Sequence, residues 1–164
     1  MADQTQLKIT SESDTQHLAN CFAQLVEAGD IILLSGDLGA GKSFFARCLI
    51  RTLADDPDLE VPSPTFALVQ PYQFKTFGCL HADLYRLSDE SEAEELGLFD
   101  DDNLMLVEWP DRLPELSAKA RFSINIDNVV GEAQGRKVTL SAKQSDLNRL
   151  AALLESSSHT IQVL

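Results

Sequence analysis

Residues 31–53 read IILLSGDLGAGKSFFARCLIRTL, and this stretch decides the fold. Its first four residues form an apolar run that is too short for a helix and begins with β-branched side chains, which is typical of a buried strand. Its last part, 43–53, has helical character. The sequence therefore predicts a strand, a glycine-rich turn and a helix in direct succession.

The turn itself, GDLGAGKS at 36–43, fits the pattern G-x-x-x-x-G-K-[ST]. Its glycines let consecutive N–H groups converge on phosphate oxygens, and the helix that follows adds the partial positive charge of its N-terminus. Lys42, whose stem we expect to be exposed, brings a full charge to the β- and γ-phosphates, and the Ser43 hydroxyl can ligate Mg²⁺. The residues expected to bind nucleotide here are Gly36, Asp37, Leu38, Gly39, Ala40, Gly41, Lys42 and Ser43.

A second apolar run, 104–107, is followed by Glu108. Proteins with a phosphate loop often have another buried strand beside the first, ending in a carboxylate that holds Mg²⁺ directly or through water. We therefore expect Ser43 and Glu108 to be metal ligands; the alternative for Glu108 is a plain strand end. ATP is favoured over GTP because the guanine-reading pattern N/T-K-x-D is absent.

Two further motifs carry candidate catalytic groups, SPTF at 63–66 and HADLYR at 81–86. Thr65, in a proline-fixed loop, could act as a switch threonine that senses the γ-phosphate and Mg²⁺. Asp83 could position the attacking water or a metal-bound water. The alternatives are that Thr65 caps a strand and that Asp83 pairs with Arg86, and spacing alone leaves both open.

Periodicity outlines the rest of the chain. We expect the first helix to follow Ser13, which has capping-box spacing to Gln16, and to end just before Gly29. Alternation over 122–126 and again around 138–140 predicts an antiparallel hairpin. The other expected elements are strands at 66–69 and 78–84, a short helix at 91–98 and a last helix at 147–154. The whole chain, 1–164, is thus predicted to be a single three-layer α/β domain, with a sheet that is parallel around the loop strand and antiparallel toward the C-terminus.

Composition excludes several classes of function. With 26 acidic and 13 basic residues the net charge is −13, which argues against a protein that binds DNA or RNA on its own. Residues 89–115 hold eleven acids and one base, Arg112, either a solvated surface or a docking face for a basic partner. The three scattered cysteines favour buried thiols over disulfides or zinc. No apolar run reaches membrane-spanning length and no leader is evident, so we expect a cytosolic protein without a membrane partner.

The motifs GDLGAGKS, SPTF, HADLYRL and LVEWP, in this order and spacing, resemble the bacterial TsaE family of small P-loop ATPases. The similarity covers about 36–110 and fades beyond Trp109. Gly135-Arg136 resembles a further family feature, and Ser11–Thr15 resembles the segment that touches adenine in that family. Serine follows Lys42 where the family usually has threonine, and both can ligate Mg²⁺. The segment 100–103 is more acidic than the family pattern leads us to expect.

The resemblance implies a role in making threonylcarbamoyladenosine on tRNA. TsaE-like proteins bind the TsaB–TsaD heterodimer, whose TsaD subunit holds the transferase site, and hydrolyse ATP in support of that assembly. Carried over to this chain, the resemblance places Lys42, Thr65, Asp83 and Glu108 among the catalytic residues. It places Ser11, Thr15, Trp109 and Arg136 at the nucleotide, in addition to the loop.

Two other functions remain open from the sequence. A small-molecule kinase would need a second pocket and usually an arginine-bearing lid, yet between Ser63 and Asp111 only Lys75 and Arg86 are basic. A non-catalytic scaffold gated by bound nucleotide would use the same motifs as a slow hydrolase, so residue patterns do not separate the two.

Overall fold

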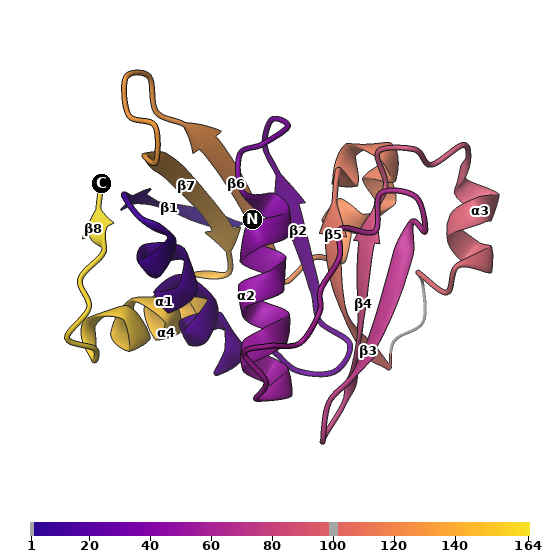
Figure 1. Ribbon diagram of the computed structural model, residues 1–164, viewed down its shortest axis with the longest axis horizontal. Helices are drawn as coiled ribbons and strands as arrows, with labels where there is room; N and C mark the ends of the chain where they lie inside the picture. Colours follow the sequence, from indigo (N-terminus) through magenta and orange to yellow (C-terminus); the bar gives the residue numbers. More distant parts are fainter. Residues whose placement is uncertain (1, 99–101) are drawn as a thin grey trace.

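The computed structural model describes residues 2–98 and 102–164 and is built around an eight-stranded sheet of order β3-β4-β5-β2-β6-β7-β1-β8 (Figure 1). The strands are β1 Asp3–Ile9, β2 Ile31–Ser35, β3 Val69–Gln73, β4 Gly78–Asp83, β5 Asn103–Glu108, β6 Phe122–Asn128, β7 Arg136–Ala142 and β8 Gln162–Val163. The α-helices are α1 Glu12–Ala23, α2 Lys42–Ala54, α3 Glu90–Glu95 and α4 Gln144–Glu155, with 3₁₀ helices at Pro110–Arg112 and Pro114–Ala118.

The centre of the sheet is parallel and its edges are antiparallel. β2 pairs in parallel with β5 on one side and β6 on the other, and β4 continues the parallel part beside β5. β3 and the β7-β1-β8 group add antiparallel pairs at the two edges. The predicted α/β class with a mixed sheet is confirmed, as is the antiparallel hairpin β6–β7.

Two apolar cores lie on opposite faces of the sheet. α1, α2 and α4 pack on one face, and Figure 1 shows α2 in front of the sheet, next to β2. The other face is covered over β2, β4 and β5 by α3 and the 3₁₀ helices. Over β6, β7 and β1 that second face carries half-buried polar side chains, because these strands alternate apolar and polar residues. The second helical layer therefore spans only half of the sheet.

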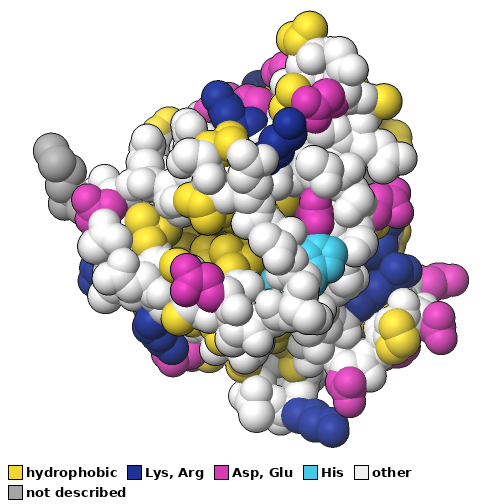
Figure 2. Space-filling model, turned by 90° about the vertical axis from the view of Figure 1, so that its left-hand side faces the viewer, with side chains coloured by type: hydrophobic (Ala, Val, Ile, Leu, Met, Phe, Trp, Pro, Cys, Tyr) yellow, Lys and Arg dark blue, Asp and Glu magenta, His cyan; other side chains and the backbone are white. Residues whose placement is uncertain are grey.

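A hollow opens between β1, α4 and β8 on the first face. Its volume is about 410 Å³, and leucines from β1, β7 and α4 line its floor. Figure 2 shows it as an apolar depression on the side of the molecule that carries α4 and β8. Of the described helices, none is long and apolar enough to cross a membrane.

The start and end of the first helix differ from the prediction. Ser11, rather than Ser13, is the N-cap, and its hydroxyl accepts from the Asp14 N–H at 3.2 Å. Asp14 in turn accepts from the N–H of Thr10 at 2.8 Å, so the capping partners are Ser11 and Asp14. The helix ends at Ala23, and Gly29 lies in the turn that leads into β2.

The prediction of a strand at 66–69 was wrong. Thr65 to Ala67 form a turn, closed by a hydrogen bond from the Leu68 N–H to the Pro64 carbonyl, and Leu68 has a φ of 66°. The strand begins only at Val69 and includes Pro71. Since β3 is an edge strand, the N–H that proline lacks need not enter the ladder. Helix α3 is also shorter than expected, and β1 and β8 were not predicted.

Arg121, just before β6, ties three parts of the first core together. Its guanidinium donates to Asp30 Oδ2 at 2.7 Å, to the Leu25 carbonyl at 2.7 Å and to Asp146 Oδ1 at 2.8 Å. The hydrogen bonds from Arg121 lower the pKa of Asp146 below its ordinary value of 3.8. This cluster joins the loop before β2, the start of β6 and the first turn of α4.

We expect Arg121→Met to destabilise the protein by about 2 to 4 kcal/mol, because two carboxylates lose their shared partner. A group whose pKa is lowered by folding stabilises the protein above its unfolded pKa, and that contribution disappears as the pH falls through the folded value. The difference between wild type and variant should therefore be largest near neutral pH and shrink below about pH 4. Urea unfolding at several pH values measures it. A difference that stays constant down to pH 2 would show that Asp146 ionisation plays no part.

Candidate functional site

The loop at 36–41 turns sharply between β2 and α2. Gly36, Gly39 and Gly41 have φ angles of 137°, 80° and 114°, which favour glycine. At Gly36 a Cβ atom would lie 2.3 Å from the carbonyl oxygen of Ile126 on β6, so no side chain fits there. Gly41 is the N-cap of α2 and provides no capping side chain, which leaves the first N–H groups of the helix available to an anion.

Lys42 is buried and not exposed as expected from the sequence, with 5% of its surface accessible. Its ammonium donates to the carbonyls of Gly36 at 2.6 Å and Asp37 at 2.9 Å, and it lies 4.3 Å from the centre of the Trp109 ring. Burial lowers the pKa of Lys42, while Glu108 and Asp83 oppose this shift. The ammonium thus lies between the loop carbonyls and an aromatic ring that the sequence alone did not place there.

The end of β5 meets the start of α2 at a direct hydrogen bond. The Ser43 hydroxyl lies 2.8 Å and 3.1 Å from the two carboxylate oxygens of Glu108, which is 2% exposed. The sheet register explains the contact: β2 and β5 run parallel with Leu34 opposite Glu108, so both strands end at the same edge. The two predicted metal ligands are therefore adjacent.

These two oxygens suit a magnesium ion. Mg²⁺ prefers hard oxygen ligands and usually takes one or two from protein, the others coming from phosphates and water. A hydroxyl and a carboxylate in contact provide that donor set. Among residues 2–98 and 102–164 no cluster of three or more histidine, cysteine or acidic side chains is arranged to hold a metal by itself.

Asp83 and Thr65 lie beside Glu108, on the side of β5 that faces β4. Asp83 is opposite Glu108 in the β4–β5 register, and its Oδ2 lies 3.4 Å from the Thr65 hydroxyl. Its Oδ1 accepts from the backbone N–H of Tyr85 at 3.1 Å. In the described part of the chain Asp83 forms no ion pair with Arg86, whose guanidinium lies over the Phe66 ring, and Thr65 caps no strand. Both alternatives from the sequence are thus removed.

One cleft of about 220 Å³ joins these groups. Its lining includes the predicted residues Leu38, Gly39, Gly41, Lys42, Ser43, Thr65, Asp83, Glu108 and Trp109. Gly36 and Asp37 do not line it, and their carbonyls instead hold the Lys42 ammonium.

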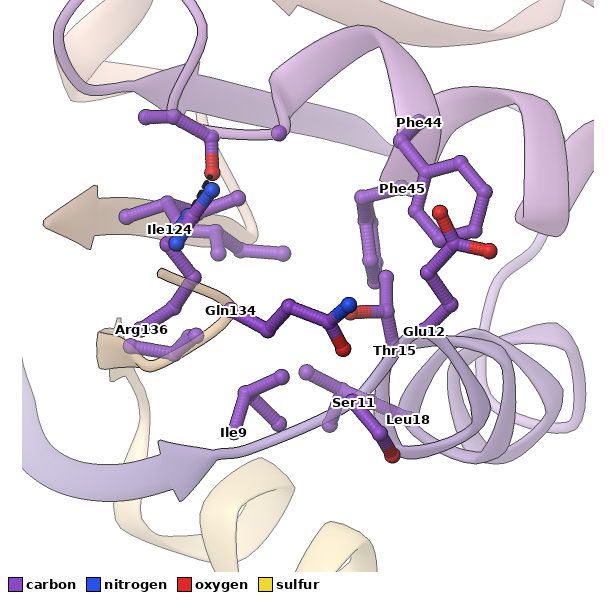
Figure 3. Close-up of a pocket in the computed structure, with 14 residues that line it drawn as sticks. Ile9, Ser11, Glu12, Thr15, Leu18, Phe44, Phe45, Ile124, Gln134 and Arg136 are labelled. Atoms are coloured by element: carbon purple, nitrogen blue, oxygen red, sulfur yellow. Dashed lines mark hydrogen bonds between the residues drawn. The ribbon is translucent and has the colours of Figure 1, made fainter. Parts of the chain in front are cut away.

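A second pocket, of about 250 Å³, begins where the cleft ends (Figure 3). Gly41 and Phe44 line both cavities. Its walls are largely apolar, from β1, α1, α2, β6 and β7, and the predicted residues Ser11, Thr15, Ala40 and Arg136 lie among them. Figure 3 shows the Gln134 side chain reaching from the β6–β7 loop toward Thr15 and Glu12. The molecule thus offers a polar cleft and an adjoining, mostly apolar pocket on the two sides of α2's first turn.

Arg136 contacts the loop from the side of this pocket. Its Nε donates to the carbonyl of Ala40 at 2.9 Å, and Nη1 donates to the carbonyl of Gly135 at 2.8 Å. These bonds connect the phosphate loop to the β6–β7 hairpin. No role followed from the sequence for Glu12, Gln134 or His81, although His81 opens the motif HADLYR and Glu12 lies within the segment 11–15.

Comparison with known proteins places this architecture in a family. Residues 9–138 match the family described as Threonylcarbamoyl adenosine biosynthesis protein TsaE. The chain is 39% identical over 121 residues to the tRNA threonylcarbamoyladenosine biosynthesis protein TsaE of Rickettsia conorii, covering 73% of this chain and 69% of that protein. It is 32% identical over 142 residues to the protein of the same name from Bacillus subtilis, covering 85% and 86%.

A solved structure shares the fold. The crystal structure of YdiB from Bacillus subtilis superposes with a TM-score of 0.71 at 23% identity, over 95% of this chain and 97% of that one. The family match runs from the end of β1 into β7 and so contains the loop, both strand ends and the hairpin. On this extent and this degree of identity, the chain belongs to the TsaE family.

Proposed function

We propose that this protein binds and hydrolyses Mg·ATP in the service of threonylcarbamoyladenosine formation on tRNA. The observation that carries the proposal is the hydrogen bond of 2.8 Å between Ser43 and Glu108. It brings the end of the glycine-rich loop and the end of the neighbouring strand together, so that Ser43 and Glu108 would hold a metal ion beside the nucleotide phosphates. The relatives from Rickettsia conorii and Bacillus subtilis are named for threonylcarbamoyladenosine biosynthesis on tRNA, which supports the pathway.

The loop and Lys42 would hold the phosphates. The uncapped N–H groups of α2 and the loop form an anion site, and the Lys42 ammonium can exchange its two carbonyl partners for phosphate oxygens. The apolar pocket behind Gly41 is then within reach of the base, with Ser11, Thr15, Gln134 and Arg136 at its wall. Trp109, beside the Lys42 ammonium, would border the phosphates.

Ser43 and Glu108 would hold the metal. A serine hydroxyl has one proton, and in this structure that proton points to a carboxylate, which leaves the oxygen lone pairs for an ion. When bound, Mg²⁺ neutralises charge on the phosphates and orients the γ-phosphoryl group.

Asp83 would orient the attacking water. One of its oxygens is fixed by the Tyr85 N–H, and the other faces Thr65, so the carboxylate is held in place within the cleft. Thr65 lies in a turn and is accessible to the γ-phosphate side of the cleft. Phosphoryl transfer needs little from a protein beyond such positioning and charge neutralisation.

The cleft has few of the basic side chains that a small-molecule kinase would need. Lys42 is the only basic side chain that lines the cleft in the described part of the chain. Arg86 and Arg112 lie instead over the rings of Phe66 and Tyr85. We further propose that the partner is a TsaB–TsaD-like pair, that tRNA is reached only through it, and that the protein works in the cytoplasm. A nucleotide-gated scaffold differs from this proposal only in lacking turnover, so phosphate release decides between them.

Replacing Lys42 by methionine keeps the apolar stem and removes the charge. We expect triphosphate affinity to fall about 10- to 100-fold, because a charge-assisted hydrogen bond to phosphate is lost. Titration with a fluorescent ATP analogue measures this, and circular dichroism checks the fold. Lys75→Met, in the exposed β3–β4 turn, is the matched control and should bind as wild type. Unchanged affinity in folded Lys42→Met would refute the assignment of the phosphate loop.

Two variants test the metal role of Glu108: Glu108→Ala, and Glu108→Gln, which keeps the shape of the side chain. Both should bind nucleotide nearly as well as wild type. Both should slow Mg²⁺-dependent phosphate release about a hundredfold, because a metal ligand is removed. Release is measured with and without the TsaB–TsaD pair, over a Mg²⁺ titration. A wild-type Mg²⁺ curve in both variants would reject the metal role. No release by the wild-type protein, even with the pair present, would favour the scaffold.

The acidic stretch gives the third test. Of its eleven acids, Glu108 is buried in the cleft, Asp89 caps α3, and Asp100 and Asp101 lie outside the described residues. Glu94 and Glu95 are exposed on α3. If this face docks on a basic partner surface, reversing both to lysine should weaken complex formation and reduce its salt dependence. Asp58→Lys with Glu60→Lys, in the exposed loop before β3, is the control.

Complex formation is measured by biolayer interferometry at several salt concentrations, and tRNA binding by the isolated protein is measured alongside. We expect negligible tRNA binding at physiological salt because of the net charge of −13. Tight tRNA binding by the isolated chain would contradict the proposal that tRNA is reached only through the partner pair. If the charge reversal leaves the affinity for the partner unchanged, the acidic stretch is a solvated surface and not a docking face.

A further inference from the structure

His81 is a buried histidine inside the candidate site to which no role has been given. It lies on β4, on the same face as Asp83, and is 1% exposed. Its Nε2 lies 2.6 Å from Glu108 Oε2, while its Nδ1 is buried and has no hydrogen-bond partner among the described residues. A buried nitrogen without a hydrogen-bond partner costs free energy, so packing alone does not account for a histidine at this position.

The hydrogen bonds around Glu108 show how His81 acts on its carboxylate. An ionised carboxylate only accepts hydrogen bonds, so the Nε2 of His81 is the donor in this contact, and Nδ1 is the unpartnered ring nitrogen. Glu108 then receives one bond from Ser43 and one from His81. A carboxylate has about four lone-pair positions, so about two are left for a metal ion or its water ligands.

We propose that His81 is a positioning residue for the metal site: its Nε2–H holds the Glu108 carboxylate in the orientation that presents its remaining lone pairs to the ion beside Ser43. The inference rests on the proposed Mg²⁺-dependent function. Glutamate has three side-chain torsions, and the Ser43 hydroxyl alone would leave its terminal torsion free to turn. A second donor from a neighbouring strand removes that freedom, as outer-shell partners of metal ligands do.

The geometry also specifies which substitutions keep the function. The amide nitrogen of glutamine reaches about as far from the backbone as the Nε2 of histidine, so His81→Gln keeps the donor to Glu108. The amide of asparagine corresponds to Nδ1, so His81→Asn loses that donor. His81→Leu fills the same buried space without any donor and serves if the asparagine variant fails to fold. His17→Asn is the matched control, since His17 also has a buried ring nitrogen without a partner but lies on α1, outside the cleft.

The experiment measures Mn²⁺ affinity by electron paramagnetic resonance in the presence of a saturating non-hydrolysable ATP analogue, and analogue affinity separately in EDTA. We expect His81→Asn and His81→Leu to bind Mn²⁺ about 10- to 100-fold more weakly, with analogue affinity in EDTA unchanged. His81→Gln and His17→Asn should bind Mn²⁺ as wild type. Thermal unfolding of each variant confirms that the comparison is between folded proteins.

The results that would overturn the inference also separate it from the proposed function. Wild-type Mn²⁺ affinity in folded His81→Asn or His81→Leu, or failure of His81→Gln to restore it, removes the positioning role and leaves the proposed function standing. Absence of nucleotide-dependent Mn²⁺ binding in the wild-type protein removes the metal site itself, and the role of His81 with it.

Discussion

The candidate site depends on the parallel pairing of β2 with β5. Parallel strands end at the same edge of a sheet, so this pairing puts Leu34, two residues before the loop begins at Gly36, opposite Glu108. From there the chain turns through the loop, and α2 begins with Lys42 and Ser43 directly above the strand ends. The Trp109 N–H then bonds to the Leu34 carbonyl and fixes the chain that leaves β5. A shift of one residue in this register would turn Glu108 to the other face of the sheet, away from Ser43.

The other half of the site comes from the antiparallel part of the sheet. Gly36 lies against the Ile126 carbonyl of β6, and Arg136 at the start of β7 donates to Ala40. The phosphate loop is therefore supported by the same hairpin that walls the apolar pocket. One close backbone approach and one guanidinium thus join the loop to the hairpin.

The sequence predicts the parts of this protein whose determinants are local. The loop, β2, α2 and the end of β5 follow from glycine spacing, apolar runs and one strand-end carboxylate, and the structure brings Ser43 and Glu108 together as expected. The errors arise where tertiary contacts decide. Ser13 has capping-box spacing, yet Ser11 is the cap, and Asp14, which bonds back to Thr10, is also in contact with His159 from the far end of the described chain. Phe66 has a side chain typical of strands, but it lies exposed in a turn beneath Arg86. The enclosure of Lys42 by Trp109 and the contact of His81 with Glu108 depend on sheet order, which residue spacing does not encode.

The pairing of β1 with β7 has a consequence for the way the chain acquires its structure. Asp3 lies opposite Ala142, so β1 is synthesised long before the strand with which it pairs. Ribosomal synthesis exposes β1, with Leu7 and Ile9 on its apolar side, long before β7 emerges. Contacts between residues so distant in sequence form slowly, since the intervening chain must first be ordered. The edge of nascent β1 therefore stays unpaired until β7 emerges, and an unpaired edge of this kind favours association with other chains.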